Sequence, residues 1–143
     1  MITMTEKFKI LGKYIKDMSS ETKDAETYIF VKDHITRYQL EININSKALK
    51  NKMIEVNTIM KFEDKEEAKK KSYFEMTYTT IVQVNEEVKD KNELEKIILC
   101  DVQLKIYSDL EKSFLDLINN SGYSGIKFEK KIDFENLYKQ RSN

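Results

Sequence analysis

Hydrophobic residues recur at every second position through the middle of the chain and at every third or fourth position after about residue 90. Spacing by two places successive side chains on opposite faces of a β-strand, whereas spacing by three and four places them on one side of a helix. Strands followed by helices are typical of an α+β fold rather than of a parallel α/β sheet. The sequence therefore predicts a four-stranded antiparallel sheet followed by helices that pack on one face.

The alternation expected of strands occurs in four segments. Their approximate ranges are 8–18, 38–45, 54–63 and 73–84. The first carries apolar groups on both faces, which is typical of a strand covered on each side. Residues 19–32 predict a long connection with a short extended piece at 28–31. The charge run at 64–71 predicts a solvated hairpin loop between the last two strands.

Helices are expected in the last third of the chain. Asn92 can cap a first helix, and a second, longer helix is expected near residues 106–119, with Gly122 beyond its end. The apolar residues of this second helix follow the 3–4 spacing: Tyr107, Leu110, Phe114, Leu117 and Ile118. Asp133 can cap a short final helix.

Composition excludes most kinds of catalytic site. Cys100 is the only cysteine and His34 the only histidine, so the chain cannot form an internal disulfide or supply the usual ligands of a zinc site. No glycine-rich phosphate-binding loop follows a predicted strand. We therefore expect no metal site and no cofactor, and a protein that is not an enzyme.

Charge and length bound the partners and the location. Lys plus Arg number 25 and Asp plus Glu number 25, so the formal net charge is zero and favours neither nucleic acid nor membrane insertion. The 143 residues are most simply one domain, 1–143. No apolar run is long enough to cross a bilayer and the N-terminus lacks the layout of a signal peptide, so a cytoplasmic protein is expected.

Two short segments carry a resemblance to a known family. The chain ends in a loop marked by Gly122, an extended stretch and the run Asp133-Phe-Glu-Asn-Leu-Tyr138. The first strand ends in Lys16-Asp17, Ser19 and Glu21, a Lys-Asp-x-Ser-x-Glu pattern. With the order of strands and helices over residues 8–141, these features resemble SecB, the bacterial protein-export chaperone. The chain differs from the family in its neutral charge and its lack of proline.

The resemblance implies a molecular chaperone that works without ATP. Such a holdase binds unfolded polypeptide clients in apolar grooves and delivers them to the translocation ATPase SecA, as a homotetramer built from two dimers. The resemblance assigns Asp17 and Glu21 to the contact with a SecA-like ATPase, with a further acidic position on the fourth strand near Glu75 or Met76. It assigns the client groove to two apolar stripes: Leu40, Ile42, Ile44, Phe134, Leu137 and Tyr138.

Other interpretations stay open. A SecB-like chaperone dedicated to one partner, such as the antitoxin of a toxin–antitoxin system, fits the same motifs. A small α+β enzyme or ligand-binding domain would share only the order of the elements. The two apolar stripes could be hydrophobic core rather than a groove, and Asp17 and Glu21 could be ordinary solvated acids.

Overall fold

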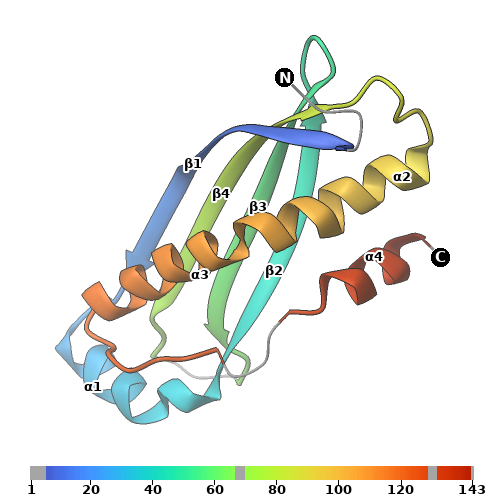
Figure 1. The fold of residues 1–143 in the computed structure, drawn as a ribbon. Helices are drawn as coiled ribbons and strands as arrows, with labels where there is room; N and C mark the ends of the chain where they lie inside the picture. The colour runs from blue at the N-terminus through green and yellow to red at the C-terminus, as the bar shows by residue number, and fades with distance from the viewer. Residues whose placement is uncertain (1–5, 67–69, 129–131, 143) are drawn as a thin grey trace.

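The computed structural model describes residues 6–66, 70–128 and 132–142 of the chain. Its centre is a four-stranded sheet, antiparallel throughout, with the spatial order β1-β4-β3-β2 (Figure 1). The strands are β1 (Phe8–Glu21), β2 (Tyr38–Ala48), β3 (Met53–Asp64) and β4 (Tyr73–Val84). The antiparallel sheet expected from the alternation is confirmed, and β1 and β2 form its two edges.

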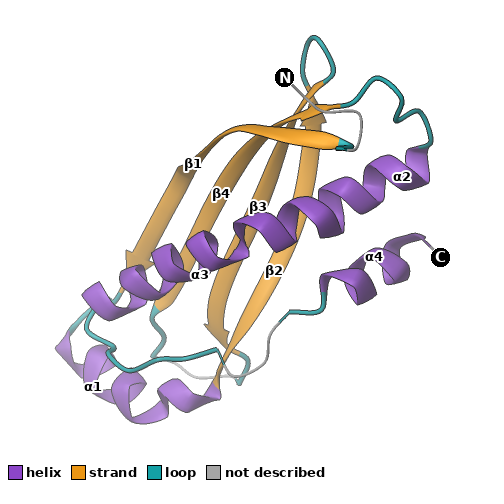
Figure 2. Ribbon diagram, viewed as in Figure 1, coloured by secondary structure: helices purple, strands orange, loops and turns teal. Residues whose placement is uncertain are grey.

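The helices lie on one face of the sheet and around its ends (Figure 2). α3 (Val102–Asn120) crosses that face, and α1 (Ala25–His34) lies at the end where β1 finishes and β2 begins. The 3-10 turn η1 (Ile35–Arg37) joins α1 to β2. α4 (Phe134–Ser142) packs beside α2 (Lys91–Lys96). The predicted arrangement of helices on one face is confirmed.

The core lies between α3 and the sheet. Even-numbered residues of β3 and β4 face the helix because successive side chains of a strand point to opposite sides; Met60 and Phe74 are at most 1% exposed. They meet a buried stripe of α3 with helical spacing: Ile106, Leu110, Phe114 and Ile118. The odd-numbered residues of β3 and β4 lie on the other side of the sheet. No described helix covers that side, which we call the open face.

β1 changes face twice along its length. Its register against β4 shifts between Ile10 and Gly12 and again between Ile15 and Asp17. Each bulge inserts one residue and reverses the alternation. These bulges account for the apolar residues on both faces of the sequence pattern. The expected strand covered on each side was wrong, since β1 is an edge strand exposed along most of its length.

Residues 28–31 are helical, so the predicted extended piece was wrong. They belong to α1, whose first turn is capped by Asp24: its Oδ1 accepts a hydrogen bond from the Thr27 N–H at 2.8 Å. Thr27 and Val31, one turn apart, are the buried residues of this helix. A short apolar run is compatible with a strand or with a buried helix, and here the N-cap at Asp24 favours the helix.

α2 and α3 form one continuous rod rather than two separate helices. Between them lies a π turn, η2 (Ile97–Asp101). The side chain of Gln103, which is fully buried, donates to the Ile98 carbonyl at 3.3 Å and accepts from the Thr58 hydroxyl at 2.9 Å. The predicted cap at Asn92 was wrong, because Asp90 caps α2 and the Asn92 N–H donates to it.

The end of α3 and the start of α4 follow the sequence prediction. Gly122 has φ +105°, and a Cβ there would lie 2.7 Å from the ring of Tyr28, whose hydroxyl donates to the Gly122 carbonyl. The helix therefore stops at a position that favours glycine. At α4, the Asn136 N–H donates to the Asp133 carboxylate at 3.1 Å, as expected of an N-cap. The predicted loop at 64–71 lies partly outside the described residues.

The β2–β3 hairpin turns through two residues with positive φ. Asn51 has φ 60° and Lys52 has φ 62°, and the Met53 N–H donates to the Lys50 carbonyl at 3.2 Å. These are the features of a type I′ turn, in which asparagine and glycine are the favoured residues. Lys52 adopts the left-handed region although it carries a Cβ, whereas glycine has no Cβ and reaches this region without steric cost.

Replacing Lys52 with glycine is therefore expected to stabilise the protein. A residue with a Cβ in the left-handed region costs about 1–2 kcal/mol. Glycine avoids this cost, but its larger conformational entropy in the unfolded chain offsets part of the gain. We expect the free energy of unfolding in urea to rise by roughly 1 kcal/mol. The control is Lys50→Gly, two residues earlier in the turn, where φ is not positive. Equal stability of the two variants would contradict this view of the turn.

A buried ion pair fastens η1 to the end of β3. The Arg37 guanidinium lies 2.7 Å from Asp64, whose side chain is 2% exposed, and 3.0 Å from the exposed Glu66. Burial alone would raise the pKa of Asp64. The Glu66 N–H and the guanidinium outweigh burial and hold this pKa below its ordinary value of 3.8.

Candidate functional site

Three acidic side chains gather at one end of the open face. Asp17 pairs with Thr77, Ser19 with Glu75, and Glu21 with Tyr73 across the β1–β4 ladder. Directly opposed residues share a face, so Asp17, Glu21 and Glu75 project from the same side of the sheet. No ion pair joins any of the three to a described residue within 4 Å.

The register places the two fourth-strand positions on opposite sides of the sheet. Glu75 lies on the open face beside the two acids of β1, whereas Met76 is completely buried on the helix side. Sequence alone could not make this choice, because the second bulge of β1 determines which of its residues oppose β4. The three acids, Asp17, Glu21 and Glu75, are called the acidic cluster below.

The strand stripe of the expected client groove lies on the helix side of β2. Leu40 pairs with Phe62, Ile42 with Met60 and Ile44 with Thr58, all helix-facing positions. Ile44 is buried, at 5% exposed, while Leu40 and Ile42 are half-buried at the edge of the core. Because β2 is an edge strand, these two are the members of the stripe that reach the surface.

The three residues of the helix stripe also differ in how deeply they are buried. Phe134 is buried, at 3% exposed, and its ring meets that of Tyr107 at 5.6 Å in an edge-on contact. Leu137 and Tyr138 are half-buried against the core, and the Tyr138 hydroxyl donates to the Asn92 carbonyl at 3.2 Å. The packing of α4 on α2 and η2 therefore places one residue of the stripe inside and two at the margin.

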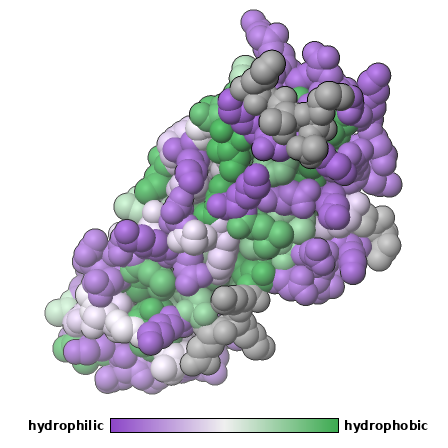
Figure 3. All heavy atoms as spheres, in the orientation of Figure 1, coloured by the Kyte–Doolittle hydropathy of each residue, from purple (hydrophilic) through white to green (hydrophobic). Residues whose placement is uncertain are grey.

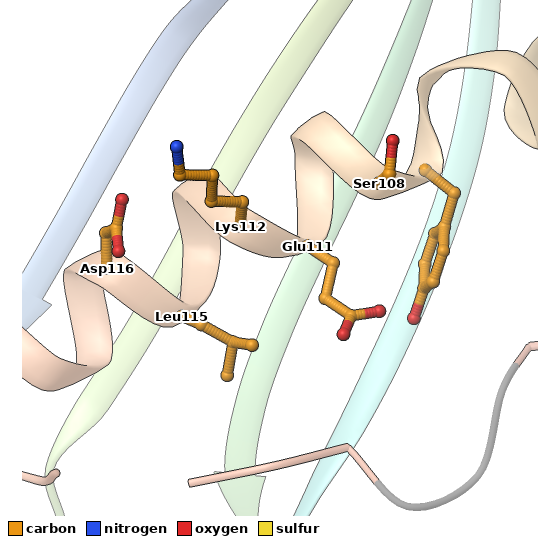
Figure 4. A pocket seen from close by; sticks show the side chains of 6 residues that line it. Ser108, Glu111, Lys112, Leu115 and Asp116 are labelled. Atoms are coloured by element: carbon orange, nitrogen blue, oxygen red, sulfur yellow. The ribbon is translucent and has the colours of Figure 1, made fainter. Parts of the chain in front are cut away.

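A hollow of about 490 Å³ lies along α3. Its lining residues occupy two adjacent stripes of the helix: Tyr107, Ser108, Glu111, Lys112, Leu115 and Asp116. Figure 4 shows Glu111 and Leu115 projecting to one side of α3 and Lys112 to the other. The sequence analysis placed Tyr107 among the apolar residues of the second helix and did not predict the hollow. The available signal was Leu115, an apolar residue outside the buried stripe of α3.

Tyr107 connects this hollow to α4. Its hydroxyl is buried beside the Glu111 carboxylate, and its ring packs on Phe134. Burial, followed by the charge of Glu111, raises the pKa of Tyr107 to about 12. The phenol therefore stays neutral at physiological pH.

Large apolar side chains are exposed along β1. They are Leu11, Tyr14, Ile15 and Met18, each between 42% and 46% exposed. On the face shown in Figure 3, hydrophobic side chains interrupt the polar surface over this edge strand and again in the middle of the molecule beside α3. An exposed apolar edge strand is a surface on which another chain can pair.

The structure has few features of other kinds of site. Within the described ranges, no group of three or more His, Cys, Asp and Glu side chains could hold a metal ion. Across that same part of the chain, no helix is long and apolar enough to cross a membrane.

Comparison with known proteins identifies the family. The SecB family, described as preprotein translocase subunit SecB, matches residues 3–143. A protein of Pelagibacter ubique described as "Putative protein-export protein SecB" is 66% identical over 140 residues, covering 98% of this chain and all of that protein. The protein-export protein SecB of Methylocella silvestris is 24% identical over 130 residues, covering 90% and 78%.

A solved structure agrees on the fold. The SecB-like chaperone of Mycobacterium tuberculosis, in complex with a peptide from an antitoxin, superposes with a TM-score of 0.65 over 88% of each chain at 11% identity. The fold is thus shared with a SecB-like protein, and the sequence match extends over nearly the whole chain. This chain belongs to the SecB family of protein-export chaperones.

Proposed function

We propose that this chain is an ATP-independent holdase that binds unfolded preproteins in the cytoplasm and delivers them to a SecA-like ATPase. The observation that carries the proposal is the separation of two surfaces. The apolar margin formed by Leu40, Ile42, Leu137 and Tyr138 belongs to the helix side, while the acidic cluster lies on the open face. A client and the ATPase could therefore be bound at the same time.

The client surface consists of this apolar margin, with Ile44 and Phe134 buried beneath it. Its four residues are half-buried, so each leaves apolar area that a client can cover. Complete burial of such a side chain contributes about 1.5–3 kcal/mol, and half-burial leaves a fraction of this for binding. Each contact is thus weak and tolerant of sequence, as a holdase needs, and several copies in one oligomer would bind a long client by avidity.

The family resemblance implies a homotetramer, and the exposed apolar edge of β1 supports the same proposal. Leu11, Ile15 and Met18 are each more than 40% exposed in the isolated chain. A 17.0 kDa subunit with such an edge needs a partner to cover it. We propose that β1 edges meet in a dimer and that two dimers join, which would also multiply the client surfaces.

Changing Ile42 and Tyr138 together to serine is expected to reduce holdase activity several-fold without unfolding the chain. Both residues are at the margin, so their loss removes client contacts while the buried residues below them remain. The measurement is light scattering of a chemically denatured client diluted into the protein. The matched control is Ile29→Ser with Tyr73→Ser, which removes the same side-chain types from exposed positions elsewhere; Ile29 is 61% and Tyr73 is 53% exposed.

Three outcomes separate the interpretations. Loss of activity in the margin variant with full activity in the control supports the groove. Unfolding of the margin variant, seen by circular dichroism, would show that these residues belong to the core. A folded margin variant with full activity would place client binding elsewhere on the molecule.

The 66% identical relative is described as a protein-export protein, which supports general export over service to a single antitoxin. A chaperone dedicated to one partner would suppress the aggregation of that partner alone. The same light-scattering assay with several unrelated denatured clients therefore distinguishes these two functions.

A further inference from the structure

A polar pair is completely buried between the sheet and the helical rod. Thr58 of β3 and Gln103, the second residue of α3, are both 0% exposed, and the Thr58 hydroxyl donates to the Gln103 Oε1 at 2.9 Å. The neighbours of Thr58 on the same side of β3, Val56 and Met60, are apolar and equally buried. Replacing both partners of such a bond with apolar side chains of the same shape can be nearly neutral for stability. Core packing alone therefore does not account for the pair.

Gln103 also holds the π turn η2. Its Nε2 donates to the carbonyl of Ile98 at 3.3 Å. The Val102 N–H donates to the carbonyl of Ile97, five residues back, which is the bonding of a π turn. A buried carbonyl needs a hydrogen-bond partner, and Gln103 supplies one inside η2. The same side chain is thus bonded to the sheet on one side and to η2 on the other.

η2 supports α4. The C-terminal helix packs on η2 and lies beside α2 (Figure 1). Cys100 of η2 is 1% exposed. Burial is the main cause that raises the pKa of the Cys100 thiol, and the carboxylates of Glu135 and Asp133 are among the charges that raise it further. The beginning of α4 therefore lies close to this thiol, and the position of α4 depends on the position of η2.

Thr58 lies next to the other half of the client surface. It pairs with Ile44, the buried residue of the strand stripe, in the β2–β3 ladder. Two hydrogen bonds, from Thr58 to Gln103 and from Gln103 to Ile98, thus lead from the strand stripe to the turn that supports α4. We call Leu40 and Ile42 the strand half of the client surface.

We propose that Thr58 and Gln103 are positioning residues for the client surface, and that their hydrogen bond fixes η2, and with it α4, at a set distance from β2. The helix half of the surface consists of Leu137 and Tyr138. Since both halves are taken to bind clients, this role rests on the proposed function. A hydrogen bond restricts length and direction, whereas apolar contacts between the same elements can slide. Weak contacts add up only when one client can reach both halves at once.

The test variant is Thr58→Val with Gln103→Met in the full chain. Both substitutions keep roughly the size of the side chain, and neither partner is left as an unsatisfied polar group. We expect this double variant to fold, as judged by circular dichroism. The matched control is Thr58→Ser, which keeps the hydroxyl and should preserve both the position of α4 and the holdase activity.

Cys100 is the only cysteine and provides a native probe of α4. Its reaction with an aromatic disulfide reagent needs η2 and α4 to separate, because the thiol is buried between them. We expect the double variant to react about tenfold faster than the wild-type chain, since local opening governs access to a buried group. Holdase activity, measured by light scattering of a denatured client, should fall several-fold in the same variant and stay at the wild-type level in Thr58→Ser.

The dependence of the labelling rate on urea separates local from global opening. A local separation of α4 exposes little surface, so the rate should change little at low urea concentrations. A rate that rises as steeply with urea as global unfolding does would overturn the proposed role, because the pair would then only stabilise the fold. If the double variant does not fold, Thr58→Val alone is judged by the same two readouts against Thr58→Ser.

The remaining outcomes are also decisive. An unchanged labelling rate in the double variant would show that the pair does not hold α4, and would overturn the proposed role. Faster labelling with full holdase activity would overturn it as well, while leaving the proposed client surface intact. Full activity of the folded Ile42/Tyr138 margin variant would instead overturn the client surface itself, and the role of the pair with it.

Discussion

Replacing Arg37 with alanine is expected to lower the free energy of unfolding by about 3 kcal/mol, because a buried carboxylate then loses its cation. The Asp64 side chain is 2% exposed, and its partner in this chain is the Arg37 guanidinium at 2.7 Å. Urea unfolding at pH 7, followed by circular dichroism, measures the loss. The control is Glu66→Ala, which removes the exposed acid on the same guanidinium and should cost less than about 1 kcal/mol.

The pH dependence provides a second test of the same ion pair. The folded pKa of Asp64 lies below its ordinary value of 3.8, so its contribution to stability is complete above that value and is lost as pH falls through the folded pKa. In Arg37→Ala the burial of Asp64 remains without the opposing cation, and its pKa should rise. The stability difference between the two proteins should therefore shrink as the pH is lowered below about 4. A constant difference down to acidic pH would contradict this role for Asp64.

If β1 edges meet as proposed, Ile15→Asp with Met18→Asp is expected to separate the proposed tetramer into smaller species. Both side chains are more than 40% exposed in the isolated chain, so a monomer loses little when they change. In a β1–β1 interface, however, the new carboxylates would be buried or brought close to one another, at a cost of several kcal/mol. Multi-angle light scattering at micromolar concentration should show a mass well below that of four 17.0 kDa subunits.

The matched control for this variant is Ile29→Asp, which places an acid at an exposed apolar position of α1. It should leave the mass unchanged. A wild-type protein that is monomeric at micromolar concentration, or a double variant that keeps the wild-type mass, would show that β1 is not the interface.

The sheet was predictable because apolar and polar residues alternate along its strands, as expected when one face of a sheet is buried and the other is open. β2, β3 and β4 each place apolar residues at every second position, and this pattern depends only on the pleat and the core. β1 was predictable as a strand but not as an edge. Each of its two bulges reverses which side chains point to the core side of the sheet. The alternation of apolar and polar residues does not reveal where a bulge occurs.

The helices were less predictable, for two reasons. Tyr28 to Val31 suit a strand by composition, and the cap at Asp24 that makes them helical is a single local hydrogen bond. The continuity of α2 and α3 depends on η2, where Gln103 and Thr58 satisfy polar groups in the interior. That contact joins residues far apart in the sequence, so no local pattern reveals it.

The face on which each candidate site residue lies was predictable, but the extent to which each is buried was not. Spacing alone put Leu40, Ile42 and Ile44 on one side of a strand, but only their place along the edge of the core separates the buried Ile44 from the half-buried pair. The same holds for Phe134 against its neighbours on α4. For the acidic cluster, the choice of Glu75 needed the register of the ladder.

The π turn between α2 and α3 affects how the chain can change in length. A π turn accommodates one residue more than the α-helical turn it replaces. Deleting one residue from η2 would convert it to an ordinary α-helical turn and leave α2 and α3 close to their present phase. A deletion between Asn92 and η2 would instead rotate Asn92, whose carbonyl accepts the Tyr138 hydroxyl, by about 100° and turn it away from α4. A single-residue gap in this rod should therefore be accepted in evolution at η2 more readily than within α2, whereas the loop between β4 and α2 can vary in length without altering the phase of the helix.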